Sequence, residues 1–394
     1  MPYMPTRREM LSLFAGSAAF AQDSGSLYPV IESLAKAADY RHSFLHPQWK
    51  SVATWRKAAR KLVLDAFTYA PQPVVPNARM LERTDLGEVI REKIEFSTSA
   101  QFRVPAYLHL PKGLGGKRAP AIVDLHSHGG MFLYGKEKVI DLGDGYPLLR
   151  AYHKANYESR PTATELARRG YVVLTIDAFP FGERRFMTPE DVAALGWDRQ
   201  KYAEEDARAL NRKCQQKEST IVKSLTYAGA TWPGVVAWDD MRSVDYLVTR
   251  PEVDPGRIGC VGVSLGGYRS LMLAGLDSRI AAGCVVGFMS TVRSMIARHV
   301  DTHSFVHFIP HIHAQLDLPD VVALRAPKPL LVLQCKRDGL FPLAGMEESV
   351  TKLEAIYKKA GVAKAFESRF FDVPHIFNIE MQEHAFAWMD RNLR

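Results

Sequence analysis

The stretch Arg257–Ser270 reads RIGCVGVSLGGYRS and places Ser264 between a short apolar run and a longer helical pattern. The run before it is apolar and rich in β-branched residues, which predicts a buried strand, and the residues after it predict a helix. Gly262 and Gly266 leave room for the sharp turn that such a strand-to-helix junction needs. The first N–H groups of the new helix would point at any oxyanion formed beside the serine. The stretch therefore predicts Ser264 as a nucleophile.

The composition indicates a globular chain with ample core. Of 394 residues, 47% are hydrophobic and 24% are charged, which favours one large α/β domain with extensions. The formal charge of +8 is spread along the chain, without basic runs interleaved with aromatics, so we expect no nucleic-acid partner. Weak attraction to an acidic polysaccharide or anionic surface remains open. Of the four cysteines, three fall in predicted core strands, which indicates small buried apolar residues rather than disulfides or metal ligands.

The N-terminus resembles an export signal. Arg7 and Arg8 precede the uncharged stretch 11–21, and Ala19-Phe20-Ala21 fits a small-residue cleavage site. This pattern predicts a twin-arginine signal peptide over residues 1–21 and a periplasmic or secreted protein, the alternative being an N-terminal arm. The apolar part is too short to anchor the chain in a bilayer, and we expect no membrane anchor elsewhere.

The rest of the chain predicts a doubly wound α/β architecture. Residues 22–80 predict a helical extension, and residues 81–394 a catalytic domain with insertions near 186–220 and 288–327. Two alternating segments, 90–96 and 102–110, predict an antiparallel hairpin at a sheet edge. Later strands are short and nearly continuously apolar, which is typical of strands buried on both faces. The prediction is a doubly wound, mostly parallel sheet of eight strands.

Two further residues complete a candidate catalytic unit with Ser264. Asp338 follows the predicted seventh strand, and His375 follows the eighth. The order Ser264, Asp338, His375, with each residue on a loop after its own strand, predicts that the histidine takes the serine proton and the carboxylate orients the imidazole. Asp372 is the second candidate for the acid. No cofactor and no metal are required.

The chain resembles the α/β-hydrolase superfamily, and within it the dienelactone-hydrolase-related and acetyl-xylan-esterase-like branch. The motifs that carry the resemblance are DAFPFGERR, VDPGRIGCVGVSLGG, KRDGLFP, VPHIFN and the HSHGG turn at 126–130. The resemblance implies a carboxylic ester hydrolase without cofactor, of the kind that removes acetyl or similar groups from plant polysaccharide. It also implies an oxyanion hole built by the N–H groups of Leu265 and His128. Ser264 stands where dienelactone hydrolases carry cysteine, and Ser127 where this oxyanion loop commonly has glycine.

Two further groups of residues are candidates for the walls of the pocket. Five histidines lie between 299 and 313, and the spacing of the first three would align them on one helix face, so they indicate a cap over the serine, with His307 facing the substrate, or a metal site. Arg184 either pairs with Glu183 to hold its loop or binds a substrate carboxylate. Two other functions stay open: a serine peptidase of the prolyl-oligopeptidase type, and an inactive hydrolase-fold binding protein. The sequence does not indicate an oligomeric state.

Overall fold

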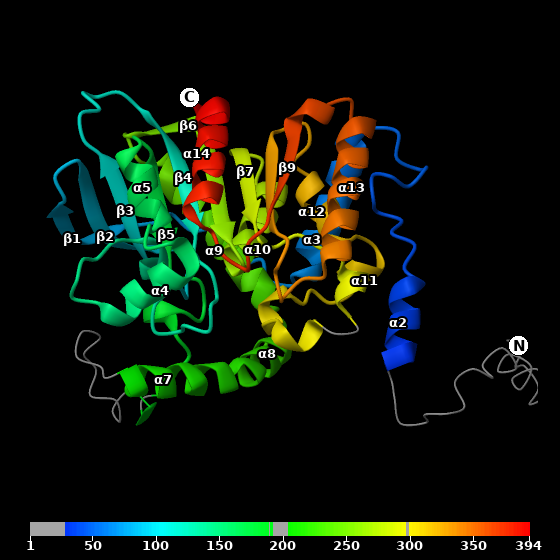
Figure 1. Cartoon of the computed structure of the whole chain (residues 1–394), viewed down its shortest axis with the longest axis horizontal. Coiled ribbons are helices and arrows are strands. Elements are labelled where there is room, and N and C mark those ends of the chain that lie inside the picture. Colours follow the sequence, from blue (N-terminus) through cyan, green and yellow to red (C-terminus); the bar gives the residue numbers. More distant parts are fainter. Residues whose placement is uncertain (1–27, 189, 192–203, 297–298) are drawn as a thin grey trace, which may run out of the picture.

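A computed structural model describes residues 28–188, 190–191, 204–296 and 299–394. Within them a single nine-stranded sheet has the order β1-β2-β3-β5-β4-β6-β7-β8-β9 (Figure 1). The strands are β1 (Arg79–Asp85), β2 (Val89–Ser97), β3 (Arg103–Pro111), β4 (Ala119–Leu125), β5 (Val172–Ile176), β6 (Val253–Val263), β7 (Ile280–Val286), β8 (Leu330–Cys335) and β9 (Phe366–Phe371). The pairs from β5 through β9 are parallel, whereas β1, β2 and β3 are antiparallel to their neighbours. The predicted mostly parallel α/β-hydrolase fold is confirmed.

The predicted count of eight strands is wrong, because β1 was not recognised. Its sequence, RMLERTD, is exposed along almost its whole length, so it lacks the alternation of apolar and polar residues that marks a half-buried strand. The predicted hairpin, β2 with β3, is present and antiparallel, but β1 covers its outer side and forms the edge of the sheet.

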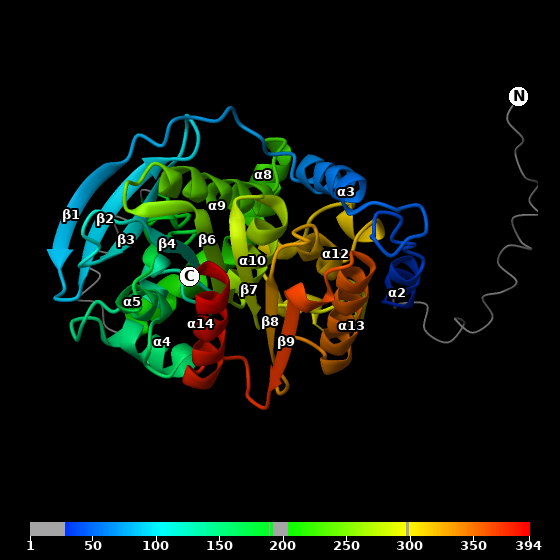
Figure 2. The ribbon, with the colours of Figure 1, turned by 90° about the horizontal axis from the view of Figure 1, so that it is seen from above.

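Helices cover both faces of the sheet. They are α2 (Tyr28–Lys36), α3 (Val52–Ala66), α4 (Pro147–Tyr157), α5 (Thr162–Arg168), α7 (Glu204–Gln216), α8 (Glu218–Tyr227), α9 (Trp232–Val248), α10 (Leu265–Leu276), α11 (Val292–Met295), α12 (Leu318–Ala323), α13 (Leu343–Lys359) and α14 (Ile379–Leu393). Figure 2 shows α9 and α10 on one side of the strands and α5 and α14 on the other. Each side has its own cluster of buried apolar side chains, so the sheet lies between two cores.

The N-terminal helices pack on the main body. In α3, Trp55 and Ala59 are buried in the larger core, and the Arg60 guanidinium donates to the Leu276 carbonyl at 2.8 Å. Residues 1–21, where we expect an export signal, lie outside the described residues. Within the described part of the chain, no helix has both the length and the apolar character needed to span a bilayer.

The two insertions lie at the carboxyl ends of the parallel strands. Figure 1 shows α7 and α8 running beneath the lower end of the sheet. The segment 288–327 is not one helix, so the predicted alignment of three histidines on a helix face is wrong. It contains α11, the single turns η4 (Val300–Thr302), η5 (Phe305–His307) and η6 (Ile312–Ala314), and α12. These turns are closed locally: the Ser304 hydroxyl, for example, accepts from the Val306 N–H.

Candidate active site

Ser264 lies at the tight junction between β6 and α10. Its backbone angles are φ 60° and ψ −124°, in a region that non-glycine residues seldom adopt, and its N–H donates to the Val286 carbonyl at 3.0 Å. A Cβ at Gly262 would lie 2.4 Å from the Leu125 oxygen, and one at Gly266 would lie 1.8 Å from it. Both glycines are therefore required by the close approach of Leu125, the last residue of β4.

Asp338 and His375 form a tight pair on the loops that follow β8 and β9. The Nδ1 of His375 and the Oδ2 of Asp338 are 2.6 Å apart, and the Asp338 side chain has no exposed surface. The other carboxylate oxygen accepts from the Leu340 N–H at 2.9 Å. Because Nδ1 is held by a carboxylate, Nε2 is left as the proton acceptor, and among the described residues it has no hydrogen-bond partner. Asp372, the second candidate acid, is exposed and pairs with Arg337.

The predicted oxyanion donors lie on two adjoining segments. Leu265 is the first residue of α10, so its N–H belongs to the first turn, whose donors have no partner within the helix. The loop after β4 packs against that turn, because the Leu125 and His126 carbonyls both lie close to Gly266. Ser127, in that loop, bonds through its hydroxyl to the Tyr152 hydroxyl at 2.6 Å. A glycine, which the resemblance implies at this position, could not make this bond.

A pocket of about 450 Å³ brings these parts together. Ser264, His375 and His128 all line it. The Nε2 of His128 lies 2.9 Å from a Glu218 oxygen, and its Nδ1 accepts from the Gly130 N–H, so Nε2 carries the proton and donates to the carboxylate. The same Glu218 oxygen accepts from the Ser304 hydroxyl at 3.0 Å. Glu218 was not predicted, since no sequence pattern marks the first residue of a helix in an insertion as facing the serine.

Part of the pocket wall is aromatic. His307 lines the pocket, and its ring lies 4.9 Å from that of Tyr268 and 4.7 Å from that of Phe288; that it faces the substrate stays a prediction. Burial, followed by the neighbouring His303 and His128, lowers the pKa of His307 well below its usual value, so the ring is neutral. Behind it a small apolar cavity of about 60 Å³ continues between α11 and α12.

Residues 15–352 match the Abhydrolase family, Abhydrolase_7. The chain belongs to this family of α/β-hydrolases. The match includes Ser264 and Asp338, while His375 lies beyond its end. A relative from Bacillus subtilis (strain 168), YtaP, provisionally assigned as a hydrolase, is 28% identical over 283 residues, which are 71% of this chain and 80% of YtaP.

Several solved structures share the fold of this Abhydrolase protein at low sequence identity. One is a Bacteroides fragilis NCTC 9343 protein provisionally assigned as an acetyl xylan esterase, with a TM-score of 0.65, 18% identity, and coverage of 89% of this chain and 83% of that one. A glucuronoyl esterase from Solibacter usitatus has a TM-score of 0.58 and 15% identity, covering 87% and 94%. An acetyl xylan esterase from Paenibacillus sp. R4 has a TM-score of 0.50 and 17% identity, covering 91% and 99%.

The structure does not bring Arg184 of this hydrolase to the pocket. Its side chain is only 6% exposed, and its guanidinium bonds to the Asp239 carboxylate at 2.7 Å and to the Asp177 carbonyl at 3.1 Å. The partner expected from the sequence was Glu183, which instead lies 2.8 Å from Lys136. Arg184 therefore holds its loop to α9 rather than reaching a substrate.

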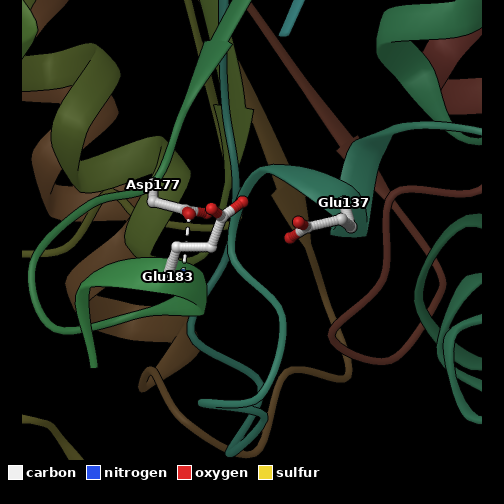
Figure 3. A group of neighbouring side chains, drawn as sticks. All are labelled: Glu137, Asp177 and Glu183. Carbon is white, nitrogen blue, oxygen red and sulfur yellow. Dashed lines mark hydrogen bonds between the residues drawn. The ribbon is translucent and has the colours of Figure 1, made fainter. Parts of the chain in front are cut away.

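One group of carboxylates in the described residues has the spacing for a cation: Glu137, Asp177 and Glu183 (Figure 3). Glu137 lies in the short turn at residues 136–139, whereas Asp177 and Glu183 both lie in the segment that follows β5. The buried ammonium of Lys136 lies 2.8 to 3.0 Å from an oxygen of each of them. The charge that a metal ion would supply is thus supplied by a side chain of the hydrolase itself.

Proposed function

We infer that this protein is a serine carboxylic-ester hydrolase that works through an acyl-enzyme. The observation that carries the inference is the pairing of His375 with the buried Asp338, which leaves Nε2 free to accept a proton in the pocket that also holds Ser264. The strained turn at Ser264 supports it, because such strain is typical of a nucleophile held at the end of a strand.

The proposed reaction uses only the chain's own groups. The Ser264 hydroxyl attacks the ester carbonyl carbon as His375 takes its proton, and the N–H groups of Leu265 and His128 stabilise the oxyanion by roughly 3 to 4 kcal/mol each. The tetrahedral intermediate then collapses, and the imidazolium protonates the leaving alkoxide. A water molecule, activated by the same imidazole, attacks the acyl-enzyme and releases the carboxylic acid and the free serine.

We propose that the substrates are esters of carbohydrate, including acetylated plant polysaccharide, encountered after export by the twin-arginine route. The structural neighbours named as acetyl xylan and glucuronoyl esterases support an ester of this kind. The polar side of the pocket, with Glu218, Ser304 and Gln215, offers partners for sugar hydroxyls.

Hydrolysis of p-nitrophenyl acetate by the wild-type protein tests the proposal. Ser264→Ala should abolish turnover, while Ser278→Ala, at an exposed serine remote from the pocket, should leave it unchanged. A parallel panel of acetylated xylo-oligosaccharides, uronic-acid esters and proline-containing peptide amides identifies the substrate. Cleavage of the peptides alone would favour the peptidase, and equal rates in wild type and Ser264→Ala would favour a binding protein.

A further inference from the structure

A second buried lysine lies directly behind the pocket. Lys138, in the turn η2 (Lys136–Val139), has no exposed surface, and its ammonium donates to the Ser127 and His128 carbonyls, each at 2.8 Å. It also stands 4.4 Å from the centre of the Phe181 ring, a cation–π contact. Burying the amino group of a lysine costs free energy, and the two bonds to carbonyls of the predicted oxyanion loop offset part of that cost.

Those carbonyls belong to the peptides that supply the loop's N–H groups. In a trans peptide the C=O and the following N–H point in opposite directions, so an anchor on the Ser127 oxygen fixes the direction of the His128 N–H. The Ser127 oxygen also accepts from His126 Nδ1 at 2.9 Å. The Ala178 N–H donates to His126 Nε2 at 3.1 Å, so Nδ1 carries the ring proton that the Ser127 oxygen accepts. Both lone pairs of the Ser127 oxygen are therefore engaged.

Donors at a carbonyl make the N–H of the same peptide a stronger donor. Hydrogen bonds in a chain polarise one another by about 10 to 30% per bond. Burial and then the Lys138 ammonium hold the pKa of His126 well below its usual value, so that ring is a neutral donor. Burial lowers the pKa of the Lys138 side chain well below its usual value, with the Asp177 and Glu137 carboxylates acting against this, so Lys138 acts on the peptide through its two hydrogen bonds to the loop carbonyls.

We propose that Lys138 is a positioning residue that orients and polarises the Ser127–His128 peptide, so that the His128 N–H stabilises the oxyanion. The inference rests on the proposed esterase function and extends it to a residue outside the pocket lining. It explains why a lysine, and not an apolar side chain, fills this space: an apolar residue would pack at lower cost but leave two buried carbonyls without their donor. Lys136, two residues earlier, differs because its bonds go to carboxylates.

Lys138→Met tests the proposal, since it keeps the length of the side chain and removes the donors. With p-nitrophenyl acetate we expect kcat to fall roughly 10- to 100-fold with KM unchanged, less than the loss of a whole oxyanion donor. The affinity for a trifluoromethyl ketone, whose adduct with the serine carries the oxyanion, should weaken by the same factor. Lys138→Gln, which keeps a donor without charge, should lie between the variant and wild type and is the second variant if Lys138→Met does not fold.

The control is Lys359→Met. Lys359 also donates to two backbone carbonyls, those of Phe44 and His46, and stands 4.6 Å from an aromatic ring, but far from the pocket. The Lys359→Met variant should keep the wild-type kcat, KM and ketone affinity. Folded Lys138 variants that keep the wild-type kcat and ketone affinity would overturn the proposal. So would variants in which only KM or the unfolding temperature changes. Absence of ester hydrolysis in the wild type would instead overturn the proposed function itself.

Discussion

Among single residues, the Asp338 carboxylate fixes the hydrogen-bonding state of His375. Asp338→Asn would still reach Nδ1, but its amide favours the tautomer in which Nε2 carries the proton and cannot accept one from Ser264. We expect kcat for p-nitrophenyl acetate at pH 7 to fall roughly 10³- to 10⁴-fold. Asp372→Asn, which changes the exposed carboxylate directly after β9, should keep wild-type kcat. Equal activity in both variants would contradict the assignment of Asp338.

A buried aspartate makes stability depend on pH. Burial raises the pKa of Asp124 to about 7, against which the Thr162 hydroxyl and then Arg269 act. Between about pH 4 and pH 7 the folded state therefore keeps a proton that the unfolded state has released. This contribution to stability is complete below about pH 4 and is lost as the pH rises to about 7. The loss is of the order of 4 kcal/mol.

Asp124→Asn should remove this dependence. Urea unfolding at pH 5 and pH 8 should show a smaller decline in the free energy of unfolding for the variant than for wild type. Asp254→Asn, at a carboxylate near the surface whose pKa Arg257 lowers, is the control and should keep the wild-type decline between these pH values. An unchanged decline in Asp124→Asn would show that the carboxyl titrates normally.

At this scale the sequence predicted that Ser264, Asp338 and His375 each follow a strand, which are β6, β8 and β9. The strands before Ser264 and Asp338 have a strong apolar pattern, whereas β9 is only partly buried, and His375 was predicted from the order of the three residues along the chain. The sequence did not predict Lys138 or Glu218. Both act through backbone groups or residues remote in sequence, and a charged side chain in a short turn or insertion is ordinarily solvated. Their roles depend on tertiary packing that no local pattern records.

At the level of elements, α8 ties the insertion to the catalytic loops through its first residue. Glu218 joins the β4 loop at His128 to η5 at Ser304. Glu218→Ala would leave both partners without an acceptor and loosen the pocket wall, so we expect KM for an acetylated xylo-oligosaccharide to rise about 10-fold with kcat nearly unchanged, as for loss of 1 to 2 kcal/mol of binding. Glu205→Ala, at an exposed position on α7, should leave KM unchanged.

The elements that sequence patterns missed share one physical property. The strand β1 is exposed, and the segment 288–327 folds as separate single turns, so neither has the apolar period that reveals a strand or helix. The buried strands β6, β7 and β8 were predicted because their residues are apolar on both faces. Prediction therefore succeeded for the buried strands and the β2–β3 hairpin, and failed for the outermost strand and for segment 288–327.

In the whole molecule, α3 joins the N-terminal segment to the core of the hydrolase. Trp55 is fully buried, its indole N–H donates to the His42 carbonyl at 2.6 Å, and its ring lies 4.9 Å from that of Phe44. Trp55→Ala should lower the free energy of unfolding by about 3 to 5 kcal/mol, measured in urea, without changing KM. Leu34→Ala, at a 70% exposed position, should change it by less than about 0.5 kcal/mol. A small effect of Trp55→Ala would mean that the segment is not part of the cooperative unit.

The glycine at 266 has a consequence for how this enzyme can diversify. Any larger residue there would push the Leu125 carbonyl away and so separate the nucleophile from the loop that carries His128. This junction allows almost no change of residue, whereas the walls built by α7 and residues 288–327 can change more freely, apart from the contacts that Glu218 makes with His128 and Ser304. New specificities would therefore arise by exchanging the walls around a reaction centre that stays fixed.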